Sequence, residues 1–315
     1  MQTKAILRTP TSIARDYALL SVGAAIITIA LKGGAYWLTD SVGLLSDAVE
    51  SLVNLVAALV AVWALTLANR PADREHTYGH AKAEYFASAA EGVMILIAAI
   101  AIGATATERL LHPRPLERVW LGLAVSCIAA LVNGGVAWVL LRAGHRLRSI
   151  TLIADAHHLL TDVWTSVGVV LGVVLVQLTG WLPFDPLIAL AVVANIIWTG
   201  MRLMRDTADG VLDHALPPSD QAVIAEVLVP HQQAGIAFHA QRTRMAGHRR
   251  FVSFHILVPG AWSVKQGHDL AEAIEQQIHA RMSDTTIFTH LEPAEDAVSW
   301  DDQSLDRADA PKNKR

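Results

Sequence analysis

The fold follows from residues 41–54, SVGLLSDAVESLVN, because a similar stretch returns 108 residues later as residues 149–162, SITLIADAHHLLTD. In each copy, three polar side chains stand at positions i, i+3 and i+7 of an otherwise apolar segment. The first copy carries Asp47, Glu50 and Asn54, and the second carries Asp155, His158 and Asp162. On a helix these three positions share one face, so the repeat predicts two helices that each present a polar stripe.

Both copies lie in segments that are long and apolar enough to cross a bilayer, where polar side chains are costly. A charged side chain near the bilayer centre opposes insertion by roughly 2.5–3.5 kcal/mol, so several of them must face one another, a cavity or a cation. Carboxylates, an imidazole and an amide that converge from two helices can bind a divalent metal ion. The alternative is a set of hydrogen bonds that holds a helix bundle together, but a histidine with several acidic residues is more charge than that role requires.

The composition indicates an integral membrane protein with a polar remainder. Of the 315 residues, 53% are hydrophobic and 17% are charged, and the mean hydropathy is +0.37. The net charge of −4 gives no indication of a nucleic-acid partner. The single cysteine, Cys127, lies in an apolar segment, which excludes a disulfide framework and argues against a thiolate metal site.

Six apolar runs predict six transmembrane helices, with membrane lipid around them. The runs cover residues 16–37, 42–68, 84–108, 119–141, 152–178 and 186–206. The first run has no small-residue cleavage site, so we interpret it as a span and not as a signal peptide. Small residues, including the Asn133-Gly134-Gly135 step, let neighbouring helices approach closely.

Basic residues near the ends of the runs give the orientation. They fall on one side if both termini are cytoplasmic, except for Arg109, Arg114 and Arg118 in the third-to-fourth connection. We therefore expect residues 1–15 to be a cytoplasmic segment and residues 16–208 to be an all-α transmembrane domain.

After Arg205 the sequence becomes amphipathic and predicts a small soluble domain over residues 209–292. Its pattern indicates a helix near 219–229, strands near 236–244 and 250–258, a helix near 264–282 and a strand near 285–291. This αββαβ order is typical of a two-layer, ferredoxin-like α+β fold. Residues 293–315 have little to bury, so we expect a disordered tail there.

Two further groups of residues could bind metal. After the second run, Asp73, His76 and His80 place a carboxylate and two imidazoles at a spacing that can close around an ion such as zinc, although a merely solvated loop is equally compatible. The soluble region is rich in histidine, which suggests metal, although strand alternation must put some of these side chains on the wrong face. They are His231, His239, His248, His255, His268, His279 and His290.

Together, the six runs, the paired stripes, the D-x-x-H-x-x-G-H pattern at 73–80 and the histidine-bearing αββαβ region resemble the cation diffusion facilitator family, in particular its bacterial zinc and iron efflux branch. The resemblance covers residues 12–292. It implies a divalent-cation efflux transporter of the bacterial inner membrane, not an enzyme, that exchanges cytosolic metal for external protons by alternating access.

The resemblance also implies site residues. The transport site falls on Glu50, Asn54, His158 and Asp162. Glu50 and Asn54 depart from the family pattern, which usually has Asp or His at the first position and Asp at the second, so manganese, iron, cobalt or nickel become as plausible as zinc. His158 is our choice of proton carrier, because the reference pKa of histidine, about 6.5, lies near cytoplasmic pH. The neighbouring His157 faces either packing or an aqueous gate.

The second site of the family corresponds to Asp73, His76 and His80. Its cytoplasmic binuclear site corresponds to His239, His255, His268 and His290, with Glu292 where Asp is more usual. The family's homodimer implies an ion pair that would fall on Lys82 and Asp213, although two unrelated solvated charges are the alternative. Two rival functions remain open, an intramembrane metalloenzyme and a membrane-bound metal sensor.

Overall fold

The computed structural model describes residues 10–39, 42–112, 119–301 and 303–305. Contacts divide the chain into two compact units between Val211 and Leu212, close to the boundary expected after residue 208. We describe each unit by itself.

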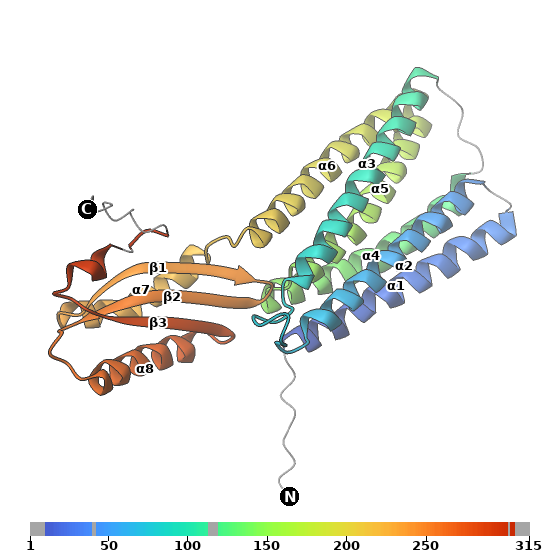
Figure 1. Cartoon of the computed structure of the whole chain (residues 1–315). Helices are drawn as coiled ribbons and strands as arrows, with labels where there is room; N and C mark the ends of the chain where they lie inside the picture. The colour runs from blue at the N-terminus through green and yellow to red at the C-terminus, as the bar shows by residue number, and fades with distance from the viewer. Residues whose placement is uncertain (1–9, 40–41, 113–118, 302, 306–315) are drawn as a thin grey trace, which may run out of the picture. The chain divides into compact units, whose positions relative to one another are not determined.

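In the described part of the first unit, six helices follow one another (Figure 1). They are α1 (Pro10–Thr39), α2 (Val42–Ala68), α3 (Ala83–Leu111), α4 (Val119–Leu147), α5 (Ile150–Thr179) and α6 (Phe184–Val211). Five of them, all except α2, are long and apolar enough to cross a membrane. The apolar part of α2 that can be assessed runs from Asn54 to Ala68. The predicted all-helical membrane domain is confirmed, and α1, α4 and α6 extend a turn or more beyond their apolar runs.

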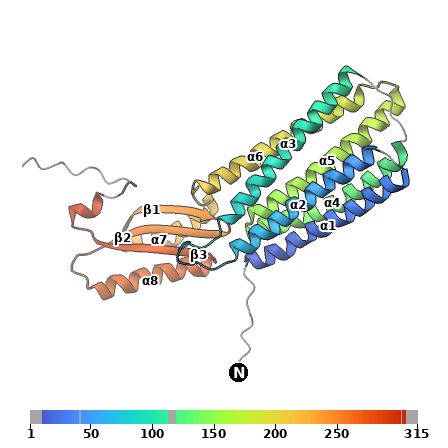
Figure 2. The same ribbon diagram turned by 45° about the vertical axis from the view of Figure 1, so that its right-hand side comes forward.

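The fifth helix occupies the centre of this unit. It packs against each of the other five helices, whereas α1 packs mainly with α2 and α4, and α3 packs mainly with α6 (Figures 1 and 2). The second copy of the polar stripe therefore lies on the helix that has the most neighbours.

Local sequence fixes where α5 begins and ends. The Ser149 side chain accepts a hydrogen bond from the backbone N–H of Leu152, as an N-cap should. At the other end Gly180 adopts a left-handed conformation, φ 72°, which costs glycine little. A Cβ added to Gly144 of α4 would lie 2.8 Å from Ile153 Cγ1, so glycine allows α4 to approach α5 this closely.

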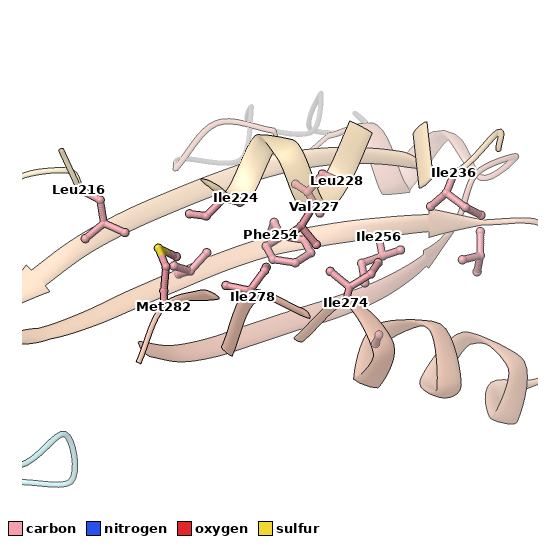
Figure 3. Close-up of a cluster of buried hydrophobic side chains, with 13 residues drawn as sticks. Leu216, Ile224, Val227, Leu228, Ile236, Phe254, Ile256, Ile274, Ile278 and Met282 are labelled. Carbon is pink, nitrogen blue, oxygen red and sulfur yellow. The ribbon is translucent and has the colours of Figure 1, made fainter. Parts of the chain in front are cut away.

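The second unit has the predicted αββαβ order. Its elements are α7 (Pro218–Gln233), β1 (Ala237–Ala246), β2 (Arg249–Val258), α8 (Val264–Arg281) and β3 (Thr285–Pro293). The sheet order is β1-β2-β3, in which β2 pairs antiparallel with β1 and parallel with β3. Figure 3 shows apolar side chains of α7 and α8 meeting those of β2, with Phe254 fully buried between them.

The expectation of a disordered tail from residue 293 is corrected over its first part. Residues Ala297–Trp300 form a short 3-10 helix, η1, capped by the side chain of Asp296. The hydroxyl of Ser299 donates to the carbonyl of Pro293, and the indole N–H of Trp300 donates to the carbonyl of Ala294. One tryptophan and a few local hydrogen bonds stabilise this turn. The polar composition of the tail does not predict such a folded turn.

A buried ion pair connects α7 to the sheet. Arg250 Nε donates to Asp220 Oδ2 over 2.8 Å, and both side chains are buried. Removal of one partner leaves an uncompensated buried charge. We therefore expect Asp220→Ala to lower the free energy of unfolding of a fragment spanning residues 212–315 by about 3–5 kcal/mol in urea titrations. The exposed Glu226–Arg281 pair of the same unit provides the control, and Glu226→Ala should cost less than about 1 kcal/mol. Equal effects of the two substitutions would contradict this account.

Candidate metal centres

The first centre lies inside the helical unit, where the two polar stripes meet. Asn54 of α2 donates through Nδ2 to Oδ2 of Asp162 on α5. The Nε2 atom of His158 lies 2.8 Å from Oδ1 of the same Asn54. All three side chains are buried. The hydrogen bond between Asn54 and Asp162 joins equivalent positions of the repeat, so the structure brings together three of the six residues that the repeat pointed to.

Only one of the two ring nitrogens of His158 forms a hydrogen bond in the described residues. Because Oδ1 of Asn54 is an acceptor, Nε2 of His158 carries the hydrogen in this arrangement. Its other nitrogen, Nδ1, is buried and has no hydrogen-bond partner among the described residues. A neutral imidazole with a free lone pair can bind a metal ion or a proton.

Glu50 belongs to the same helix as Asn54 and precedes it by about one turn. Its side chain lies outside the described residues, as does that of Asp47. The role expected for Glu50 therefore stays a prediction. His157 is half-buried, and within the described residues no hydrogen bond joins its side chain to this centre.

Asn133 of α4 is a member of the centre that the sequence interpretation missed. Its Nδ2 donates to Oδ2 of Asp162 over 3.0 Å, and its Oδ1 is buried without a hydrogen-bond partner in the described part of the chain. From sequence, the Asn133-Gly134-Gly135 step indicates only close helix packing. An amide in the middle of an apolar helix, beside two glycines, was the available signal.

The second centre lies in the loop between α2 and α3, where Asp73, His76 and His80 come within binding distance of one ion. One donor atom from each residue lies within 4.8 Å of the others. Nδ1 of His76 lies 3.3 Å from Asp73 Oδ1, and Nε2 of His80 lies 3.3 Å from Asp73 Oδ2. The structure thus places all three predicted residues together.

Backbone groups keep the carboxylate of this loop ionised. The N–H of His76 donates to Asp73 Oδ1 over 2.6 Å, and the N–H of Glu75 donates to the same oxygen over 2.9 Å. The His76 hydrogen bond is the largest cause of a lowered pKa for Asp73. Asp73 therefore remains a carboxylate at pH values where free imidazoles are already protonated.

The third centre lies on one face of the sheet, where strand register aligns three histidines. His239 stands opposite His255 in the antiparallel pair, and His255 stands opposite His290 in the parallel pair. Glu292 follows His290 by two residues and so points to the same face. Its Oε2 lies 2.8 Å from Nε2 of His239 and 3.3 Å from Nδ1 of His255.

The five residues predicted for this centre are not equally close. His239, His255 and Glu292 have donor atoms within 4.8 Å of one another. His290 is more exposed, and its Nε2 lies 3.6 Å from Glu292 Oε1, at the rim of the group. His268 stands on the exposed surface of α8 and does not belong to the group found among the described residues.

Trp300 of η1 borders the third centre and was not expected there. The centroid of its ring lies 5.7 Å from that of His239. The short helix that follows β3 therefore covers one side of the histidine group.

The residues predicted for an ion pair between subunits have other contacts within the chain. Lys82 Nζ donates to the carbonyl of Val211 over 3.3 Å. Asp213 accepts from Arg244 Nη1 over 3.2 Å. The pair between subunits stays a prediction.

The position of Trp300 gives a direct test of metal binding at the third centre. A paramagnetic ion such as Co²⁺, held by His239, His255 and Glu292, should quench the fluorescence of Trp300. We expect Co²⁺ titration of the full-length protein to quench part of the tryptophan emission, and both Trp300→Phe and His239→Ala to remove that part. His279→Ala, which changes a histidine of α8 outside the group, is the control. Unchanged quenching in His239→Ala would place the ion elsewhere.

Comparisons with known proteins show which family the chain resembles. Residues 18–211 match the family described as the cation efflux transmembrane domain, and residues 216–294 match the family described as the cation efflux protein, cytoplasmic domain. A protein named "Uncharacterized transporter sll1263" from Synechocystis sp. is 54% identical over 302 residues, which cover 96% of this chain and 97% of the relative. "Cation-efflux pump FieF" from Pectobacterium carotovorum is 32% identical over 281 residues, which cover 88% of this chain and 91% of the relative. The protein of that name from Serratia proteamaculans is 31% identical over 283 residues, which cover 89% of this chain and 92% of the relative.

The two matched domains account for both compact units. This family consists of multi-pass membrane transporters of cations and not of enzymes. With a family match over most of its length and relatives that are more than 30% identical, the chain belongs to the cation diffusion facilitator family of cation efflux transporters.

Proposed function

We propose that the protein exports divalent metal ions from the cytosol in exchange for protons, through the buried group of Asn54, His158 and Asp162. The observation that carries this proposal is the direct contact of these polar side chains from two apolar helices. The relatives named as cation-efflux pumps support it. The comparisons give no support to the metalloenzyme or to the sensor.

The ligand atoms fit a divalent cation. Asp162 offers a carboxylate, His158 an imidazole nitrogen and Asn54 an amide oxygen, a mixed set that suits Mn²⁺, Fe²⁺, Co²⁺, Ni²⁺ and Zn²⁺. A carboxylate from Glu50 would complete the neutralisation of the ion. In the structure, Asp162 accepts hydrogen bonds from the side-chain amides of Asn54 and Asn133. Metal binding therefore exchanges the Asn54 hydrogen bond for coordination bonds, while the Asn133 hydrogen bond keeps Asp162 oriented.

Protons act as the counter-substrate because they compete for the same ligand atoms. A metal ion needs neutral imidazole and ionised carboxylate, so metal binding releases protons and protonation releases the metal. If the group opens alternately to the two sides of the membrane, protons that enter from outside displace metal taken from the cytosol. We place the protein in the bacterial inner membrane as a homodimer with both termini in the cytoplasm.

Substitution of the central ligands tests this proposal. We expect His158→Ala and Asp162→Ala to abolish metal flux in proteoliposomes while leaving the protein monodisperse, because each removes a ligand without adding bulk. His157→Ala changes the neighbouring histidine outside the group and should keep flux within about twofold of wild type, a difference of only roughly 0.4 kcal/mol. Flux at the wild-type rate in Asp162→Ala would refute the site.

Asn133 should contribute by orienting Asp162. A hydrogen bond to a charged group contributes about 1.5–3 kcal/mol, so we expect Asn133→Ala to raise the KM for metal by roughly tenfold or more. The adjacent Gly134→Ala is a suitable control, because its added Cβ would lie 3.6 Å from Val163 Cγ2, an ordinary contact. An unchanged KM in Asn133→Ala would show that Asn133 contributes only to helix packing and does not orient Asp162.

A further inference from the structure

A second pair of acidic side chains is buried in the helical unit, apart from the three centres. Glu91 of α3 is fully buried, and neither of its carboxylate oxygens has a hydrogen-bond partner among the described residues. Asp155 of α5 is 1% exposed. Its Oδ1 accepts a hydrogen bond from the hydroxyl of Ser21 on α1 over 2.8 Å, and its Oδ2 has no partner in the described part of the chain.

The two carboxyl groups belong together. α5, which carries Asp155, packs against both α3 and α1. Ile95, about one turn beyond Glu91 on α3, lies in the same buried cluster as Ala154, which directly precedes Asp155. Three helices that meet through α5 thus each carry a buried oxygen-bearing side chain: Glu91 on α3, Asp155 on α5 and Ser21 on α1.

Comparison with another glutamate of α3 shows that burial alone does not explain Glu91. Glu84 is also fully buried, but its carboxylate accepts a hydrogen bond from the Ser149 hydroxyl that caps α5. Glu84 therefore has a structural role with a protein partner. The oxygens of Glu91 have no such partner among the described residues, although an unpaired buried polar group costs free energy.

A cation accounts for this arrangement. Both oxygens of a carboxylate are acceptors, but neither oxygen of Glu91 nor Oδ2 of Asp155 has a donor beside it in the described residues. No lysine or arginine pairs with Glu91 there either. Two buried carboxylates provide the charge that neutralises one divalent ion lying between them.

The position of the pair connects it to the transport centre. Asp155 precedes His158 by three residues and Asp162 by seven on α5, so the three side chains share one helix face. Three residues correspond to roughly 4.5 Å along the helix axis. A cation held at Asp155 is therefore about one helical turn from the ligands of the transport centre.

We infer that Glu91, Asp155 and the Ser21 hydroxyl form a second intramembrane site for a divalent cation, from which the ion passes to the transport centre. The inference rests on the proposed function for the direction of passage, but the existence of the site does not. The site offers only oxygen atoms, so it prefers harder ions such as Mn²⁺ to Zn²⁺, which favours nitrogen or sulfur ligands.

Counting bound ions tests the site without any need for transport. Full-length protein that carries Asp162→Ala is dialysed against Mn²⁺ alone, and the bound ions are counted by electron paramagnetic resonance. Addition of Glu91→Gln to this background should lower the count by one ion per chain. Addition of Glu84→Gln, the matched control on the same helix, should leave the count unchanged. An unchanged count in the Glu91→Gln protein overturns the inference.

A second variant guards against misfolding. Asp155→Asn should cause the same loss of one ion, and gel filtration shows whether either protein remains monodisperse. If only the pH dependence of transport shifts while the ion count stays the same, the pair holds a proton and the cation site is refuted.

Transport assays separate this inference from the proposed function. In the otherwise wild-type protein, Glu91→Gln should lower Mn²⁺ flux about tenfold at concentrations below KM, with a smaller effect at saturation. If wild-type protein moves no ion, the proposed function fails and the ion count still decides whether the site exists. If wild-type protein transports Mn²⁺ and Glu91→Gln changes neither flux nor ion count, the second site alone fails.

Discussion

The structure depends on how polar side chains are satisfied inside a layer of apolar helices. Asp162 is the clearest case, because its carboxylate accepts hydrogen bonds from amides on two other helices, Asn54 of α2 and Asn133 of α4. These bonds lower the cost of a buried charge and at the same time set the three helices at fixed distances. The same requirement explains why Asn54, Asn133, His158 and Asp162 lie together although they come from three helices.

In the cytoplasmic unit, the positions of the histidines are set by strand pairing and not by side-chain hydrogen bonds. There the sheet register aligns side chains, since one antiparallel and one parallel pairing place His239, His255 and His290 in a row. Glu292 joins the row because alternate residues of a strand share a face. Precise placement of ligands in this unit comes from backbone hydrogen bonding, whereas in the helical unit it comes from side-chain hydrogen bonding.

The sequence allowed much of this to be predicted where a pattern repeats. The 108-residue repeat pointed to Asn54 and Asp162, and periodicity predicted both the helical unit and the αββαβ unit. Isolated residues were harder. Asn133 has no counterpart in a repeat, and Glu91 occurs once in an apolar helix, so neither shows which neighbour it faces.

Two further differences arise from tertiary structure. Trp300 lies in a stretch whose polar composition indicates disorder, and only its packing beside His239 reveals a folded turn. His268 was grouped with the other histidines by resemblance to the family, but its place on the outer surface of α8 separates it from them within one chain. Helix faces and loop turns of this kind are decided by contacts that are distant in sequence.

The central place of α5 has a consequence for motion. Since α5 touches all five of its neighbours, it cannot tilt alone without breaking packing on several sides at once. The helix pair α3–α6 makes fewer contacts with the group of α1, α2 and α4 than the helices make within each set. The boundary between these two sets is therefore where sliding disturbs the least packing. Sliding along that boundary shifts Glu91 relative to Asp155 while leaving Asn54 and Asn133 beside Asp162. Such a rigid-body displacement separates the two carboxylates and preserves the transport centre.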